Sequence, residues 1–259
     1  MAAISTLHTV FGVLGNASGL FLFLAPTITF QRIINNGSTE QFSGVPYVMT
    51  LLNCLLSGWY GLSFVSENNT LVMVINGVGA VIEAVYVVVF VMYATKEAKT
   101  KVVGLVCFAV AAFSTVALVS VFSLSGDTRR SFCGFTASVF SVIMYASPLS
   151  IMRTVIRTKS VEFMPFFLSL FVFLCGASWF IFGLLGNDPF LYVCNGFGTL
   201  LGAIQLIVYA IYKGTGHEGD KQAAKEAGSA IETGLVDGKK HREEENSTTA
   251  IQPSENNQV

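Results

Sequence analysis

Two asparagines stand at matching places within long apolar stretches of the chain. Asn76 and Asn195 each open an Asn-Gly-x-Gly motif. A side-chain amide offers donors and an acceptor, and in an apolar stretch it must find partners. The two amides could join neighbouring helices, or both could face a central cavity, where they could bind the hydroxyl groups of a small polar ligand. We favour the cavity, because the two amides occupy equivalent positions.

Ser57 and Trp179 form a second candidate pair. Ser57 lies four residues before Gly61, and Trp179 lies four residues before Gly183. An indole face can stack on the C–H face of a sugar ring, and a small residue opposite it leaves room for one ring. Trp179 could instead be an interfacial or packing aromatic, but it lies in the middle of an apolar stretch. We therefore predict that both residues line one site, and that their difference in size affects ligand selectivity.

The matched spacings indicate that the chain contains a duplicated unit. Gly61 lies 35 residues after Pro26, and Gly183 lies 35 residues after Pro148. Duplicated hydrophobic units with matched proline and asparagine positions are typical of transporters that have a site at the repeat interface. A further matched pair lies ten residues after the two asparagines and consists of Tyr86 and Gln205.

Four prolines lie in or at the ends of the apolar stretches of the two units: Pro26 and Pro46 in the first, Pro148 and Pro165 in the second. A proline inside a helix removes one backbone hydrogen bond and kinks the chain. The bends could be static, since prolines are common in membrane helices. Two prolines in each half favour a set of hinges instead, although the intervals within the pairs differ, at 20 and 17 residues.

The composition is that of a membrane protein. The chain is 53% hydrophobic and 12% charged, whereas soluble domains are about 25% charged. A helix needs about 20 apolar residues to cross a bilayer, and seven stretches qualify, which predicts an all-α membrane protein. The seven stretches are residues 7–29, 45–65, 71–94, 102–124, 132–152, 166–186 and 190–212.

The lysines and arginines predict the orientation. Eight of those in or next to the connections fall on one side and two on the other, and the richer side is expected to be cytosolic. The N-terminus is then outside and the C-terminal tail inside. The first stretch has no basic segment before it and no small-residue cleavage site after it, so we expect it to be retained.

Each repeat unit contains three of the seven stretches. Two adjoining units with three spans each would face opposite ways, and the extra stretch between them restores a common orientation. We predict two parallel three-helix bundles joined by an inverting linker helix, in a 3+1+3 order. The predicted parts are a first unit (1–98), the linker helix (99–125), a second unit (126–213) and a disordered cytosolic tail (214–259), in which nine acidic residues outnumber five basic ones.

These features resemble the SWEET (MtN3/saliva) family of sugar transporters, and its glucose-transporting plant members in particular. The resemblance rests on the 3+1+3 order, the two Asn-Gly-x-Gly motifs and the proline-bearing segments at residues 24–26, 143–152 and 162–166. It covers residues 7–213, and SWEETs are themselves an established example of parallel repeats. The resemblance implies uncoupled, bidirectional movement of a sugar such as glucose across a membrane, most simply the plasma membrane. It also implies a homo-oligomer, for which a trimer is one candidate.

The resemblance assigns roles to single residues as well. The four prolines correspond to a tetrad near the cytosolic gate. Tyr60 and Asp188 correspond to a pair that closes the extracellular gate, although Asp188 alone fits equally well as a turn residue before Pro189. The Ser57 and Trp179 pair is similar to that of members that carry a monosaccharide. The residues expected to line the sugar pocket are Ser57, Asn76, Trp179 and Asn195, with Asn53 and Cys175 one turn earlier.

Glu83 keeps a proton-coupled alternative open. It is the only acidic residue well inside a predicted span, and acids in such places are candidates for a functional role. Its repeat counterpart is Gly202, which cannot titrate, and no Lys, Arg or His is expected to be buried in the spans to relay a proton. We therefore expect uniport rather than symport.

Other functional classes fit the sequence less well. Amino-acid transporters of the PQ-loop type share the general layout, but here Thr27 and Leu149 follow the prolines instead of glutamine. An enzyme would need a nucleophile–base pair or a metal cluster, whereas the histidines lie at positions 8, 217 and 241 and the five cysteines form no CxxC motif. We expect no enzyme activity, cofactor, metal or nucleic-acid partner, and the sugar and the lipid bilayer as partners. A receptor that acts through its tail would be distinguished by truncation at residue 214.

Overall fold

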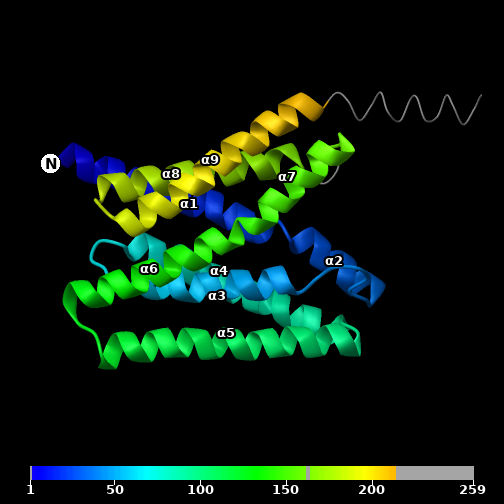
Figure 1. Ribbon diagram of the computed structural model, residues 1–259, viewed down its shortest axis with the longest axis horizontal. Coiled ribbons are helices and arrows are strands. Elements are labelled where there is room, and N and C mark those ends of the chain that lie inside the picture. Colours follow the sequence, from blue (N-terminus) through cyan, green and yellow to red (C-terminus); the bar gives the residue numbers. More distant parts are fainter. Residues whose placement is uncertain (1, 162–163, 214–259) are drawn as a thin grey trace, which may run out of the picture.

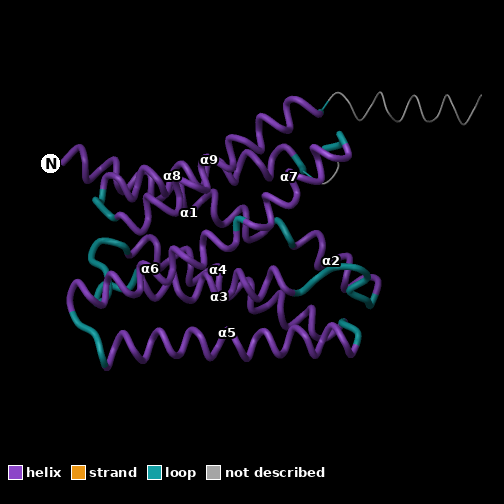
Figure 2. The backbone as a smooth tube through the Cα atoms, in the orientation of Figure 1, coloured by secondary structure: helices purple, strands orange, loops and turns teal. Residues whose placement is uncertain are grey.

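Helices make up nearly all of the described chain (Figures 1 and 2). The computed structural model describes residues 2–161 and 164–213, so the predicted tail at 214–259 and two residues of the segment 162–166 lie outside the described residues. The described ranges contain nine helices and no strand: α1 (Ala2–Leu24), α2 (Thr27–Asn36), α3 (Val45–Tyr60), α4 (Thr70–Tyr93), α5 (Lys96–Phe122), α6 (Gly126–Met144), α7 (Ala146–Thr158), α8 (Phe166–Leu185) and α9 (Pro189–Tyr212).

Six helical segments of the described chain are long and apolar enough to cross a membrane. Two of them are broken helices, since α1 continues into α2 and α6 continues into α7. The remaining predicted span, residues 45–65, is shorter than expected: α3 has 16 residues, which is about 24 Å at 1.5 Å per residue. A series of turns follows Tyr60 and completes this stretch. The seven helical segments therefore occur in the predicted order.

The predicted ends of the first and fifth spans, at residues 29 and 152, are wrong. The helical chain continues to Asn36 in α2 and to Thr158 in α7. Arg32 and Arg153 therefore lie on exposed helical turns rather than in loops, while Ile33 and Val155 on the same two helices are fully buried. Because such amphipathic helices mix charged and apolar residues, a search for continuous apolar stretches stops too early.

The two halves of the bundle have the same internal contacts. The α3–α4 contact corresponds to α8–α9, the α1–α4 contact to α6–α9, and the α2–α4 contact to α7–α9. Between the halves, α1 packs on α8 and α6 packs on α3. Matching helices run in the same direction in Figure 1, and α5 lies along the outer side of the first half against α3 and α4. This is the predicted arrangement of two parallel three-helix units and a linker helix.

Buried apolar side chains form one large cluster and one small one. The large cluster involves α2 to α4 of the first half and the linker helix α5, and reaches α6, α8 and α9 at the interface between the halves. The small cluster consists of Met152, Val155, Met164 and Val208, and holds α7 against α9. The larger buried apolar core thus lies in the first half and reaches the interface between the halves.

Two matched glycines allow close helix packing within each half. A Cβ at Gly61 would lie 2.5 Å from the backbone nitrogen of Met73, and a Cβ at Gly183 would lie 2.6 Å from that of Tyr192. Real Cβ atoms do not approach backbone this closely. Met73 and Tyr192 are themselves repeat counterparts, so the sequence repeat holds in three dimensions.

Replacing either glycine with alanine is expected to destabilise the bundle. Because backbone atoms cannot move aside as side chains can, each overpacked variant should lose about 1–3 kcal/mol of unfolding free energy. Thermal unfolding of the purified protein in lipid nanodiscs measures the loss. Gly104→Ala on α5 is the matched control, since nothing lies within 4 Å of its added Cβ. Equal melting temperatures for Gly183→Ala and Gly104→Ala would contradict the close approach.

Candidate functional site

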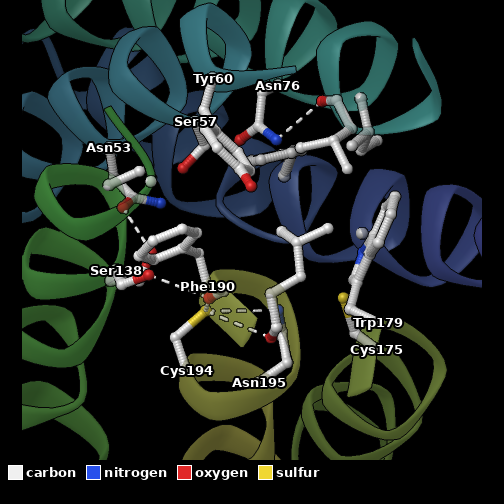
Figure 3. Close-up of a pocket in the computed structure, with 18 residues that line it drawn as sticks. Asn53, Ser57, Tyr60, Asn76, Ser138, Cys175, Trp179, Phe190, Cys194 and Asn195 are labelled. Atoms are coloured by element: carbon white, nitrogen blue, oxygen red, sulfur yellow. Dashed lines mark hydrogen bonds between the residues drawn. The ribbon is translucent and has the colours of Figure 1, made fainter. Parts of the chain in front are cut away.

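A cavity of about 180 Å³ lies between the two halves, with walls from α1, α3, α4, α6, α8 and α9 (Figure 3). This is smaller than the roughly 300–1,000 Å³ of pockets for drug-sized ligands, so the cavity suits one small molecule. All six residues predicted to line a pocket lie in its wall: Asn53, Ser57, Asn76, Cys175, Trp179 and Asn195.

Asn76 on α4 and Asn195 on α9 make the same hydrogen bond within their own helices. The Nδ2 of Asn76 donates a hydrogen bond to the carbonyl of Val72 at 2.9 Å, and the Nδ2 of Asn195 donates to the carbonyl of Leu191 at 2.9 Å. Both partners lie four residues earlier on the same helix, so neither amide joins two helices. Within the described residues, neither side-chain carbonyl has a hydrogen-bond partner, which leaves two acceptors for a ligand.

Trp179 is held between α1 and its own helix. Its ring lies so close to Gly15 that a Cβ there would be 2.7 Å from the Cε2 atom, and it packs edge-on against Phe182 at 5.1 Å between ring centroids. In the other half, Ser57 replaces Trp179, and Ala137 replaces Gly15 in the cavity wall. The large aromatic thus requires the smaller partner on the neighbouring helix.

Asn53 and Cys175 lie one turn from Ser57 and Trp179, as predicted. The Oδ1 of Asn53 accepts a hydrogen bond from the hydroxyl of Ser141 at 2.9 Å, which joins α3 to α6 across the two halves. Cys175 Sγ lies 3.9 Å from the carbonyl of Gly15. The amino group of Asn53 therefore remains a donor on the cavity side, whereas Cys175 contributes a largely apolar surface.

The prediction from sequence missed the contribution of α6. Ser138, Ser141 and Gly134 on this helix line the cavity, and the Ser138 hydroxyl donates to the carbonyl of Phe190 at 2.9 Å. The interval of 122 residues that relates Pro26 to Pro148 also relates Gly12 to Gly134. The repeat therefore identified the helix itself, but gave no sign that its serines line the cavity.

Tyr60 and Asp188 are hydrogen-bonded at one end of the cavity. The Tyr60 hydroxyl donates to Asp188 Oδ2 at 2.6 Å. Two residues that the sequence did not suggest contact the same oxygen, Asn69 at 2.8 Å and Arg130 at 3.4 Å. Asp188 is 2% exposed, and its Oδ1 accepts the backbone N–H groups of Phe190 and Leu191 at the start of α9. One carboxylate thus connects α3, α4, α6 and α9.

The four prolines all lie at the starts of helices. Pro26 precedes α2, Pro46 is the second residue of α3, Pro148 is the third residue of α7, and Pro165 precedes α8. At these positions the missing N–H has no helical partner to lose. Pro148 and Pro165 line a second cavity of about 370 Å³, whereas Pro26 and Pro46 do not. The structure therefore brings the second pair together in the wall of one cavity.

Glu83 lies away from the central cavity. Its side chain is 3% exposed, and its Oε2 has no hydrogen-bond partner among the described residues. Its counterpart Gly202 packs against the backbone of Phe173, where a Cβ would lie 2.8 Å from Cα. The acid therefore has no equivalent in the second half, as its sequence position indicates.

The sequence matches the profile of the MtN3/saliva family, described as sugar efflux transporters for intercellular exchange, over residues 9–98 and 131–217. These two matches coincide with the two halves of the bundle. The bidirectional sugar transporter SWEET1 of Arabidopsis thaliana is 67% identical over 216 residues, which cover 83% of this chain and 87% of that one. SWEET1a of Oryza sativa subsp. japonica is 62% identical over 83% of this chain and 78% of that one.

A solved structure agrees with the fold. A eukaryotic SWEET transporter with 43% sequence identity superposes with a TM-score of 0.80, over 82% of this chain and 99% of that one. The matching helical order, the duplicated family profile and the relatives' identities lead to one conclusion. This chain is an integral membrane protein of the SWEET (MtN3/saliva) family, whose members are sugar transporters and not enzymes.

Proposed function

We propose that the protein is a bidirectional uniporter that moves a monosaccharide such as glucose by alternating access. The observation that carries this proposal is the small cavity between the halves, which places repeat-related amides beside a serine and a tryptophan. The amides match the hydroxyls of one sugar ring, and the indole matches its C–H face. Relatives named as bidirectional sugar transporters support the same proposal.

Access to the cavity differs between its two ends. At the end of the bundle where α8 connects to α9 (left in Figure 1), Tyr60 lines the cavity and donates to Asp188 of that connection. Toward the end that carries Lys159 (right in Figure 1), Cys175 and Asn195 line both the central cavity and the second cavity. With the basic side in the cytosol, the hydrogen bond between Tyr60 and Asp188 closes the extracellular end of the central cavity, and we call this contact the latch. The second cavity lies on the cytosolic side of the central cavity.

The movement that we propose is a rocking of the two halves, residues 1–98 and 126–213, about the linker at 99–125. Breaks at Pro26 and Tyr145 divide the first helix of each half into two parts, and Pro46 and Pro165 lie at the starts of the following helices. Helix starts absorb changes in backbone angles more readily than helix interiors do. All four prolines are therefore placed to act as hinges.

Glucose uptake into proteoliposomes tests uniport directly. Uptake should follow the glucose gradient in either direction, and it should be unchanged by a protonophore, because no proton movement is coupled to it. Sucrose should be carried more slowly, since the cavity holds one ring. Loss of glucose uptake on addition of the protonophore would overturn uniport in favour of proton coupling.

Glu83 gives the second test of this point. Glu83→Gln keeps the shape of the side chain and removes its ability to release a proton, and we expect glucose uptake within twofold of wild type at every pH between 5 and 8. The reason is that Glu83 does not line the central cavity. The expectation would be contradicted if an inward proton gradient stimulated glucose uptake by the wild type but not by Glu83→Gln.

We further propose a plasma-membrane location, an extracellular N-terminus and a homo-oligomer. Large apolar side chains such as Val81 and Ile207 are more than half exposed on the outer faces of α4 and α9, where lipid or another protomer would cover them. Native mass spectrometry in nanodiscs and protease protection of tagged termini test these proposals. Truncation at residue 214 should leave transport intact.

A further inference from the structure

The second cavity adjoins the central one on the side toward Lys159. Cys175 and Asn195 line both cavities, and from them the second cavity extends along α8 and α9 to Pro148 and Pro165. Its volume of about 370 Å³ is roughly twice that of the central cavity, at about 180 Å³. A sugar that leaves the central cavity in this direction would therefore enter a space large enough to hold it.

Gln205 is a buried amide in the wall of this second cavity. It is 5% exposed, and its Oε1 has no hydrogen-bond partner within the described residues. A buried carbonyl without a partner is unfavourable, so such groups in native proteins usually bind water or a ligand. Ser169 places a buried hydroxyl in the same wall. The cavity therefore has a polar place in an otherwise mainly apolar lining.

In the first half, the position equivalent to Gln205 is occupied by Tyr86, whose side chain has partners within the protein. Tyr86, the counterpart of Gln205, donates to the carbonyl of Phe23 at 3.1 Å and lies 2.8 Å from the hydroxyl of Thr27. Its ring stacks on Phe30 at 4.4 Å between centroids. The hydroxyl of Tyr86 is thus fully hydrogen-bonded within the protein.

The second half lacks these partners. The repeat interval of 122 residues places Leu149 at the position of Thr27 and Met152 at that of Phe30, and neither offers a hydroxyl or a ring. Tyr145, at the position of Phe23, uses its own hydroxyl on the carbonyl of Cys194 at 3.0 Å. The polar pair of the first half is therefore replaced by an amide that has no partner among the described residues and lies in the wall of a cavity.

We propose that the second cavity is an inner sugar subsite, in which Gln205 accepts a hydrogen bond from a sugar hydroxyl between the central site and the cytosol. This inference rests on the proposed sugar transport. It makes the inner path asymmetric: sugar passes along α8 and α9, where the amide is free, and not along α4, where Tyr86 fills the equivalent position. The subsite binds sugar before the rate-limiting movement and is not part of that movement.

Gln205→Met tests the subsite, because methionine keeps the length of the side chain and removes the amide. Zero-trans glucose flux is measured in oriented vesicles from each side. For flux from the Lys159 side, KM should rise about three- to tenfold and the maximal rate should rise in proportion, as expected when binding in the ground state is lost. For flux from the Asp188 side, both values should stay within twofold of wild type.

Two further variants serve as a control and as a second test of the Gln205 amide. Ile207→Met, on the exposed face of the same helix (58% exposed), should have the wild-type KM and maximal rate from both sides. If methionine at position 205 perturbs folding, Gln205→Leu provides the same test and should give the same shift in KM. Equal KM values for wild type and both Gln205 variants, or equal shifts from both sides, would overturn the inner subsite alone. A wild type that moves no sugar would overturn the proposed function and the subsite with it.

Discussion

Replacing both Asn76 and Asn195 with alanine is expected to reduce glucose uptake by up to about 100-fold. Each amide contributes an acceptor carbonyl that is free on the cavity side, and its loss removes hydrogen bonds worth about 0.5–1.5 kcal/mol each. Since 1.4 kcal/mol corresponds to a factor of ten, each single variant should lose about tenfold and the pair about the product of the two. Initial rates of radiolabelled glucose uptake, at matched protein density, give the comparison.

The fold should survive this double substitution. Both amides donate only within their own helices among the described protein contacts, so no bond between helices is lost and the melting temperature should fall by only a few degrees. Asn35→Ala, at an exposed position of α2, is the matched control and should transport at the wild-type rate. Uptake by the double variant at half the wild-type rate or more would end the assignment of the two amides to the sugar site.

Asp188→Asn is expected to lower glucose uptake about tenfold or more. The variant keeps an oxygen that can cap α9, but places an amino group where Tyr60, Asn69 and Arg130 now donate to Oδ2. Hydrogen bonds to a charged group are worth about 1.5–3 kcal/mol. The latch at the Asp188 end should therefore fail to close, and the carrier should be held open to the outside.

Quenching of Trp179 fluorescence measures this opening separately from transport. The chain has two tryptophans, so a Trp59→Phe background leaves Trp179 as the only one. Iodide added at the Asp188 side should quench Trp179 more strongly in Asp188→Asn than in the parent protein. Asp127→Asn, at an exposed position in the first turn of α6, should change neither uptake nor quenching. Normal uptake with unchanged quenching in Asp188→Asn would contradict a latch.

The sequence repeat predicted the pairs of residues that meet in the cavity, because duplication places equivalent residues around one axis. Asn76 with Asn195, and Ser57 with Trp179, follow from spacing alone. The contribution of α6 was missed for a physical reason: serines such as Ser138 and Ser141 resemble ordinary small residues of an apolar helix, and only packing against α3 and α9 gives them partners.

The broken helices and the full set of Asp188 contacts could not be predicted in the same way. Hydropathy detects continuous apolar stretches, whereas α2 and α7 place Arg32 and Arg153 on helical turns beside buried residues. Asn69 and Arg130 are 119 and 58 residues from Asp188 in sequence. They contact one carboxylate because the start of α4, the start of α6 and the connection between α8 and α9 pack together. No local sequence pattern predicts this packing.

Glucose binding to the cavity is the central claim, and fluorescence of Trp179 in the Trp59→Phe background measures it most directly. Titration with glucose in nanodiscs should give a saturable change, because the indole is in the cavity wall. Adding Asn76→Ala and Asn195→Ala to this background should abolish the change, while Asn35→Ala should preserve it. A saturable change of equal affinity without the two amides would contradict the central claim.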